Sequence, residues 1–240
     1  MSDVERYYNE FYGELARLDA AGNDFSKISG LVAEELANGR RLRVADLGCG
    51  YGSVSAGLAA RGHTVYGLEL GDAALRALPE RGVRPIKGDL AATLPLGDGS
   101  VDVVLLLDVL EHVFNPLRLL TEAHRVLRPA GVMIVTVPLY FDVVDRIRVL
   151  FSGSILSYDN LVYGSSVAGR FRSYNYDHIR FFRPADVLEL LRLAGLTVER
   201  RIFGPIPSGP VTALRPPLRL LARWLPRLFA HSLELRARKS

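Results

Sequence analysis

Three glycines spaced two residues apart, directly after an apolar strand, constrain this chain more than any other feature. The segment from Val44 to Gly52 reads Val-Ala-Asp-Leu-Gly-Cys-Gly-Tyr-Gly, and a helix-like segment follows it. Glycine lets the backbone adopt positive φ and lets a ligand approach closely, because it has no Cβ. A strand that leads into such a turn is typical of the cofactor loop of a doubly wound α/β sheet.

Two carboxylates near this loop indicate what kind of ligand it would take. The spacing is GxGxG, which differs from the GxGxxG of dinucleotide-binding proteins. Asp46 precedes the glycines, where it would repel a pyrophosphate but attract the amino group or sulfonium of a cationic ligand. Glu69 ends the next expected strand, about twenty residues beyond Gly48, where a carboxylate accepts hydrogen bonds from ribose hydroxyls. Together they predict a pocket for a nucleoside without phosphates.

Strand and helix patterns alternate along most of the chain. The run Val101–Leu107 is almost continuously apolar, which favours a strand covered on both faces. We expect strands at 42–47, 64–69, 83–88, 101–107 and 131–137, and helices at 25–38, 53–61, 72–78, 116–127 and 183–191. This alternation is typical of an α/β domain with a parallel sheet.

Five segments, in order, resemble the motifs of class I S-adenosylmethionine-dependent methyltransferases. The segments are Asp46–Gly52, Tyr66–Glu69, Gly88–Leu90, Asp102–Val113 and Glu122–Val132. Each motif is weak by itself, but five at family spacing are specific. The resemblance covers residues 30–138 strongly and 177–204 moderately. It is closest in kind to the methionine-biosynthesis-W-like and ubiquinone-biosynthesis-like small-molecule enzymes of that family.

The resemblance implies a fold and a cofactor. The fold would be one domain over 1–240, a doubly wound, seven-stranded, mostly parallel Rossmann-like sheet of order 3-2-1-4-5-7-6 with an inserted cap. Strands at 197–203 and 231–238 would be its antiparallel sixth and seventh strands. The cofactor would be S-adenosyl-L-methionine, with Asp89 holding the adenine amino group and Leu90 the ring edge. The implied cofactor-binding residues are Asp46, Gly48, Cys49, Gly50, Glu69, Leu70, Asp89, Leu90, Asp108 and Val109.

Composition narrows the remaining possibilities. A chain of 240 residues that is 49% hydrophobic and 23% charged suits a globular domain with a real core. Its single cysteine, Cys49, cannot form an intramolecular disulfide, and it is expected to be a small residue near the ligand. A nucleophilic role for Cys49 lacks a supporting His or Asn motif. The N-terminus shows no signal pattern and no apolar stretch is long enough to span a bilayer, so the cytoplasm is the expected location.

Positive charge is concentrated at the C-terminal end. The net charge is +4, but residues 200–240 hold nine Arg or Lys and one acidic residue, so the rest of the chain carries −4. A nucleic-acid enzyme more often carries basic charge beside its active site, so no nucleic-acid partner is expected. In the basic amphipathic segment 205–230, arginines recur every four residues from Arg215 to Arg227, interrupted by Pro226. Residues 215–229 would contact an anionic membrane or a lipid-linked, phosphate-bearing acceptor; an ordinary solvated Arg face is the alternative.

Two further segments lie outside the minimal sheet. The N-terminal helical segment 1–38 begins with an aromatic-rich stretch that would either close over the cofactor or pack on the sheet edge. Residues 139–180 form a long, aromatic connection, which in a compact domain is usually functional, so we interpret them as an acceptor-binding cap. A solvent-exposed insertion is the alternative. The segment Tyr176–Phe182 resembles one in sugar- or quinone-directed methyltransferases, whereas Pro138-Leu139 departs from their usual Pro-Asn.

Two histidines are candidates for a general base. Methyl transfer from a sulfonium is an in-line displacement, which requires positioning and, for some acceptors, removal of a proton. His178, at the C-terminal edge of the cap, would face the acceptor, and His112, after the fourth strand, would face the rim of the pocket; a purely structural role is the alternative for His112. The five His are scattered in sequence and match no metal motif, so no metal is predicted, although some quinone-directed relatives bind a divalent ion near the motif that contains Glu111 and His112.

The sequence therefore predicts a methyltransferase. The expected acceptor is a small molecule or a glycan- or lipid-linked precursor, methylated on oxygen. A catalytically silent S-adenosylmethionine-binding partner of another enzyme is one alternative. A nicotinamide-dependent oxidoreductase is another, and Asp46 together with the missing GxGxxG argues against it. The sequence does not indicate an oligomeric state.

Overall fold

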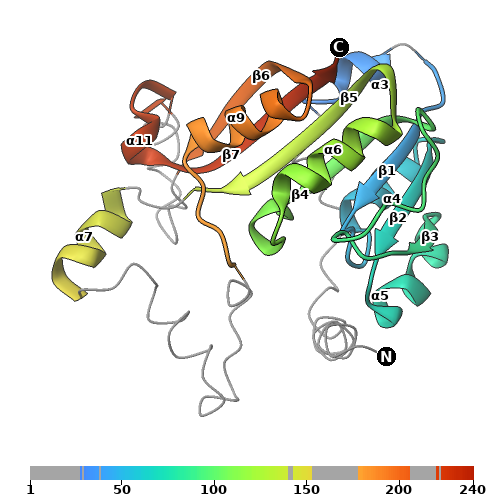
Figure 1. The fold of residues 1–240 in the computed structure, drawn as a ribbon, viewed down its shortest axis with the longest axis horizontal. Coiled ribbons are helices and arrows are strands. Elements are labelled where there is room, and N and C mark those ends of the chain that lie inside the picture. Colours follow the sequence, from blue (N-terminus) through green and yellow to red (C-terminus); the bar gives the residue numbers. More distant parts are fainter. Residues whose placement is uncertain are drawn as a thin grey trace.

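The computed structural model describes residues 28, 30–37, 39–139, 143–152, 178–205, 220–221 and 223–240. A single seven-stranded sheet runs through these residues in the order β3-β2-β1-β4-β5-β7-β6 (Figure 1). This is the order that the sequence predicted. The predicted helical segment before residue 28, most of the cap and residues 206–219 lie outside the described residues.

The first half of the sheet is parallel throughout. β1 pairs with β2 on one side and with β4 on the other, and β2 pairs with β3. The carboxyl ends of these strands therefore meet at one edge of the sheet, where open α/β sheets bind ligands. The elements are α3 (Ala33–Ala37), β1 (Arg43–Leu47), α4 (Ser53–Ala59), β2 (Thr64–Glu69), α5 (Asp72–Ala77), η1 (Pro79–Arg81), β3 (Arg84–Lys87) and β4 (Val101–Leu107).

The second half of the sheet contains the one strand that reverses direction. β4 and β5 are parallel, whereas β7 pairs antiparallel with both β5 and β6. The expected antiparallel pairing of the last two strands is confirmed, and β6 consequently runs parallel to β5. The elements are η2 (Leu110–His112), α6 (Pro116–Val126), β5 (Leu127–Pro138), α7 (Val143–Ser152), α9 (Pro184–Leu193), β6 (Leu196–Pro205), α11 (Pro226–Phe229) and β7 (Ala230–Lys239).

Both faces of the sheet are covered, as the apolar run in β4 predicted. Val103 and Leu105 belong to one hydrophobic cluster, while Val104 and Leu106 belong to the other. Since side chains alternate along a strand, each face of β4 is buried in its own core. Leu58 of α4 packs in the first cluster, and α6 and α9 contribute to the second.

The prediction of one continuous helix over 25–38 was wrong where the structure describes it. Ile28 is helical, but residues 30–32 form a turn and a bend, and α3 begins only at Ala33. Gly30, which favours a break in a helix, lies at this turn. The apolar residues of the pattern still reach the core: Ile28, Leu31 and Val32 are buried.

β5 begins earlier than the sequence predicted, at Leu127 rather than residue 131. The β4–β5 register shifts between Val101 and Val103, so the start of β5 is irregular. Ala130 in this stretch has a positive φ of 57°, which is unusual for a residue with a Cβ. The sequence hides this part of the strand, because apolar and polar residues do not alternate regularly in Leu127–Gly131.

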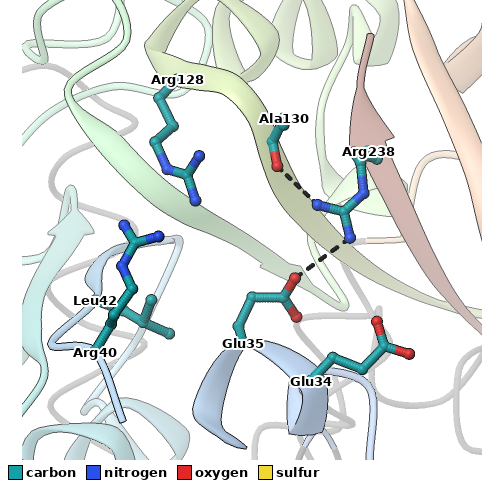
Figure 2. Close-up of a pocket in the computed structure, with 7 residues that line it drawn as sticks. All are labelled: Glu34, Glu35, Arg40, Leu42, Arg128, Ala130 and Arg238. Atoms are coloured by element: carbon teal, nitrogen blue, oxygen red, sulfur yellow. Dashed lines mark hydrogen bonds and ion pairs between the residues drawn. The ribbon is translucent and has the colours of Figure 1, made fainter. Parts of the chain in front are cut away.

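A cavity of about 240 Å³ lies at the opposite edge of the sheet from the glycine loop. Figure 2 shows Arg40 and Arg128 facing one another across it, and Arg238 joined to Glu35 and to the Ala130 carbonyl. The seven lining residues are Glu34, Glu35, Arg40, Leu42, Arg128, Ala130 and Arg238. Because it lies beside the amino ends of β1 and β5, it is separate from the predicted cofactor site.

Candidate active site

The glycine loop has the geometry that its sequence predicted. Gly48, Gly50 and Gly52 all have positive φ, at 75°, 52° and 72°. The Gly48 amide donates to the Leu68 carbonyl at 2.8 Å, which ties the start of the loop to β2. A Cβ added at Gly48 would lie 3.0 Å from Cγ2 of Val109 and 3.4 Å from Cδ1 of Leu90. The absence of a side chain at Gly48 thus lets Val109 and Leu90 pack directly against the loop.

That same position brings three predicted cofactor residues together. Gly48 follows β1, Leu90 follows β3 and Val109 follows β4, yet their atoms converge. Val109 is buried and Leu90 is half-buried against the same core cluster. Asp89 is exposed, and its Oδ1 accepts a hydrogen bond from the Ala91 amide at 2.8 Å. The residues fit an apolar wall for a flat ring with a carboxylate at its edge.

Asp46 is buried at the end of β1, beneath the glycine loop. The Ser55 hydroxyl of α4 donates to its Oδ2 at 2.5 Å. The pKa of the Asp46 carboxyl is raised to about 6: burial raises it most, the Ser55 hydrogen bond opposes the rise, and the nearby charge of Glu69 adds to it. A buried carboxylate whose pKa is raised in this way suits a cationic ligand, because the charge of the ligand would favour the ionised form.

Glu69 connects the two loops that flank the predicted pocket. Its Oε2 accepts a hydrogen bond from the Gly50 amide at 3.1 Å, and its Oε1 accepts from the amides of Leu70 and Gly71 at 2.6 and 3.3 Å. The side chain is buried. These three amides fix the carboxylate between the glycine loop and the loop that follows β2. Leu70 therefore contacts the Glu69 carboxylate through its backbone amide and not through its side chain.

Cys49 does not have the surroundings of a nucleophile. Burial, followed by the charges of Asp46 and Glu69, raises the pKa of its thiol well above the ordinary value. Reactive cysteines instead have a lowered pKa in an electropositive setting. Its Sγ lies where a Cβ at Gly67 would approach to 2.8 Å, so Cys49 fills a tight space between the loop and β2.

Asp108 leaves β4 in a strained conformation. Its φ is +55°, and Thr136 of β5 holds it there: the Asp108 amide donates to the Thr136 carbonyl and to Oγ1, while that hydroxyl donates to Oδ1 of Asp108 at 2.8 Å. Strained residues of this kind cluster at functional sites. The turn directs the chain into Val109 and η2. Sequence reasoning missed Thr136, because one threonine in an apolar strand carries no motif.

The two predicted bases meet at one carboxylate. Oε1 of Glu111, which is fully buried, lies 3.7 Å from Nε2 of His178 and 3.9 Å from Nε2 of His112. The two imidazole rings are 4.6 Å apart and nearly perpendicular. The side chain of His178 is 8% exposed and that of His112 is 21% exposed. The histidines seemed scattered in the sequence, and the fold brings these two together.

Hydrogen bonds fasten the segment that begins at His178, at the C-terminal edge of the predicted cap, to the loop after β4. The amides of Ile179 and Arg180 donate to the Glu111 carbonyl at 3.0 and 3.2 Å. The Arg180 guanidinium donates to the carbonyls of Val113 and Phe114. His178 is therefore held against η2 by backbone contacts that the sequence pattern could not reveal.

Metal ligation is also geometrically open to this cluster. Among the residues that the structure describes, one group of carboxylate and imidazole groups has all its ligand atoms within 4.8 Å of one another, namely Glu111, His112 and His178. Two imidazoles and one carboxylate are ligands that transition metals accept. The prediction of no metal stays a prediction.

The fold and the glycine loop after β1 define the class of protein: a doubly wound α/β domain with a predicted nucleoside-binding loop. Comparison with known proteins gives its family. Residues 45–135 match the family model described as "Methyltransferase domain". The ubiquinone biosynthesis O-methyltransferases of Pseudomonas syringae and Ruegeria pomeroyi are 30% and 32% identical to the chain; each alignment covers 69% of this chain, and it covers 69% and 65% of the respective relative. The chain spans 52% of a Mycolicibacterium smegmatis protein named "Probable S-adenosylmethionine-dependent methyltransferase", at 33% identity over 65% of this chain.

Solved structures share the fold over nearly the whole chain. Magnesium protoporphyrin IX methyltransferase from Synechocystis PCC 6803, with bound S-adenosylhomocysteine, superposes with a TM-score of 0.60 at 21% identity, covering 99% of this chain and 98% of that one. An S-adenosylmethionine-dependent methyltransferase from Thermotoga maritima gives 0.58 at 22%, covering 98% of each chain. The chain belongs to the class I S-adenosylmethionine-dependent methyltransferases. Its cofactor is S-adenosyl-L-methionine.

Proposed function

We propose that this methyltransferase methylates a hydroxyl oxygen of a small-molecule acceptor, which includes acceptors linked to a lipid or a glycan. The observation that carries the proposal is the approach of His178 and His112 to one buried carboxylate, Glu111, directly after the Val109 wall. A hydroxyl is a weak nucleophile, and a positioned base that takes its proton speeds attack. The similarity to ubiquinone biosynthesis O-methyltransferases supports an oxygen acceptor.

The chain's own residues would hold the cofactor between the ends of β1, β2 and β3. Asp46 would face its cationic groups, Glu69 its ribose, and Asp89 with Leu90 its adenine. Gly48, Cys49, Gly50, Leu70, Asp108 and Val109 complete the proposed cofactor-binding set. When bound, S-adenosylmethionine supplies an activated methyl group on a positively charged sulfur.

His178 or His112 would take the acceptor proton. A neutral imidazole accepts a proton near pH 7, and the resulting cation would lie within 4 Å of Glu111 Oε1. Burial of that carboxylate strengthens the attraction, because the local dielectric is low. Residues 139–180 would cover the acceptor as a cap; of these, 140–142 and 153–177 lie outside the described residues.

The acceptor experiment compares hydroxyl-bearing and amine-bearing compounds by the S-adenosylhomocysteine they release. The proposal expects turnover with hydroxyl acceptors and a loss of at least tenfold in His178→Ala or His112→Ala. His231→Ala, at an exposed histidine of β7, is the matched control and should keep full activity. Full turnover in both cluster variants would show that neither histidine acts as the general base. A loss of activity on adding EDTA would indicate that the cluster binds a metal instead.

Cofactor placement is tested separately by calorimetry with S-adenosylhomocysteine. Asp46→Ala and Glu69→Ala should each weaken binding at least tenfold, whereas Glu80→Ala, an exposed residue of η1, should not. NADH should not bind. Unchanged affinity in both pocket variants would contradict the placement.

We also propose a peripheral membrane contact through the basic segment 215–229. Its support is the spacing of the arginines and the positive charge of residues 200–240. Arg223 is exposed, while Arg215 and Arg219 lie outside the described residues. No helix in the described residues is both long enough and apolar enough to cross a bilayer. The cytoplasm stays the predicted location.

A further inference from the structure

Helix α7 presents apolar side chains to solvent on one face. Ile147, Leu150 and Phe151 are exposed, Phe151 to 83%. Their spacing of three and four residues places them on the same side of the helix. Arg146 is also exposed. Exposed large apolar side chains that cluster in this way usually mark an interaction surface.

Residues 220–225 present a second set of exposed apolar side chains. Leu220, Leu221, Trp224 and Leu225 are exposed, Trp224 to 74%. The Leu225 amide donates to the Leu221 carbonyl at 2.7 Å, so a helical turn brings these side chains into one stripe. Arg223 is exposed beside Trp224. We call this stripe and the α7 face together the docking surface.

Both parts of the docking surface lie at the same end of the molecule. Figure 1 shows α7 and α11 together at the end toward which the arrow of β5 points. Residue 225 directly precedes α11, and β7, which follows α11, pairs through Ser232 with Pro138 at the carboxyl end of β5. The surface thus lies toward the edge of the sheet that carries the cofactor loop and η2.

The sequence around residues 220–225 carries charge of one sign, whereas α7 carries Asp145 together with Arg146 and Arg148. Residues 201–233 contain no Asp or Glu but five arginines, at 201, 215, 219, 223 and 227. Anionic lipid headgroups attract such a stretch, and apolar side chains next to it insert at the headgroup boundary. Tryptophan is enriched at this boundary. A protein partner with mixed surface charge would not require this complete lack of acidic residues.

We propose that α7 and residues 220–225 form one docking surface for an anionic bilayer. α7 extends the proposed tail contact into a two-part attachment, which fixes the orientation of the sheet relative to the membrane. The acceptor that this arrangement fits is an amphiphile presented at the bilayer surface. That last statement rests on the proposed methyl transfer, whereas the docking itself rests on the exposed side chains.

Flotation of the full chain with vesicles tests the docking surface. The vesicles contain phosphatidylcholine alone or with about one third phosphatidylglycerol, and only the anionic set should bind the protein. Leu150→Ser with Phe151→Ser, and separately Trp224→Ser, should each lower binding about tenfold or more, because both remove inserted apolar area. Leu193→Ser is the control: Leu193 is an exposed leucine at the end of α9, near the other end of β7, and should bind as wild type.

Several outcomes would overturn the proposal. No binding of the wild type, or equal binding to neutral vesicles, would remove the anionic membrane. If the α7 variant binds vesicles as wild type does, α7 is not part of the docking surface and only the contact through the C-terminal basic segment is left. A lipid-free dimer that the same substitutions dissociate would assign the surface to a second copy of the chain. Affinity for S-adenosylhomocysteine should be unchanged in all of these variants, and turnover of a soluble acceptor should be unchanged in Trp224→Ser, which lies outside the proposed cap; these readouts separate a failure of docking from a failure of the proposed function.

Discussion

The Ser55 hydroxyl donates a 2.5 Å hydrogen bond to Oδ2 of Asp46, and both residues are buried. Ser55 lies in the first turn of α4 and Asp46 in β1, on either side of the glycine loop. The bond stabilises the ionised form of Asp46 against the effect of burial. The bond therefore does two things: it joins α4 to β1 across the glycine loop, and it favours the negative charge of Asp46 where the cofactor would bind.

Ser55→Ala should weaken cofactor binding while leaving the fold intact. The change removes the hydrogen bond that lowers the pKa of Asp46, so a larger fraction of this carboxyl is protonated near neutral pH. We expect affinity for S-adenosylmethionine to fall by about 1.5–3 kcal/mol, the usual value of a hydrogen bond to a charged group. Calorimetry at pH 7 measures it. Ser53→Ala is the control, because Ser53 lies two residues earlier in the chain and is half-buried.

Asp46→Asn should stabilise the cofactor-free protein at neutral pH. Burial raises the folded-state pKa of Asp46 to about 6 from 3.8, so the folded protein binds this proton more tightly than the unfolded chain does. The resulting stabilisation is present below about pH 4 and is lost as the pH rises through 6. The asparagine variant does not titrate there. The difference in free energy of unfolding, variant minus wild type, should therefore grow between pH 4 and pH 8. The expected growth is up to about 3 kcal/mol in favour of the variant.

Urea unfolding at several pH values checks this difference. The same variant should bind S-adenosylmethionine much more weakly than wild type, since it has no charge to offer. A stability difference that does not change between pH 4 and pH 8 would mean that Asp46 is not the titrating group.

Ala130→Gly should stabilise the turn at the start of β5. Ala130 has φ +57°, where a Cβ costs about 1–2 kcal/mol, and part of the gain is offset by the greater freedom of glycine in the unfolded chain. The expected net gain is about 0.5–1 kcal/mol. Gly131→Ala is the opposite case: its Cβ would lie 2.8 Å from the Arg128 carbonyl oxygen, so that variant should be destabilised. Thermal unfolding of both variants distinguishes the two effects.

Asp102→Asn should cost about 2 kcal/mol at neutral pH, because it leaves partly buried guanidiniums without their counter-charge. Arg128 Nε lies 2.6 Å and Arg43 Nε 3.4 Å from the Asp102 carboxylate. Burial would raise the pKa of Asp102, but the Arg43 amide and the Arg128 guanidinium outweigh it and hold the pKa below its usual value. The contribution of this carboxylate is present above about pH 4 and is lost as the pH falls through the lowered folded-state pKa.

The difference between Asp102→Asn and wild type should therefore shrink in acid. Asp98→Asn is a suitable control, because Asp98 is paired with Arg125 but is largely exposed. A constant difference down to pH 2 would show that the loss comes from packing rather than from charge.

The resemblance of five sequence segments to the methyltransferase motifs predicted the order of the strands, and the glycine spacing predicted the conformation of the loop after β1. Strand 101–107 agrees to the residue with β4, and the apolar run predicted burial on both faces, because short-range periodicity reports directly on the environment of a strand. The glycines at 48, 50 and 52 predicted a loop with positive φ, which only glycine adopts at little cost. Local patterns failed where the sequence shows no period, as at the turn of residues 30–32 and in the irregular start of β5 at residues 128–130.

Only the tertiary structure brought Glu111, His112 and His178 together. His112 and His178 are far apart in the chain, and their 4.6 Å ring contact depends on backbone bonds from Ile179 and Arg180 to Glu111. The sequence alone indicated which residues are candidates for the chemistry, because it contains residue type and local spacing. Which of them share one site was decided by the packing of distant segments, since proximity in space comes from the whole folded chain and has no local signature.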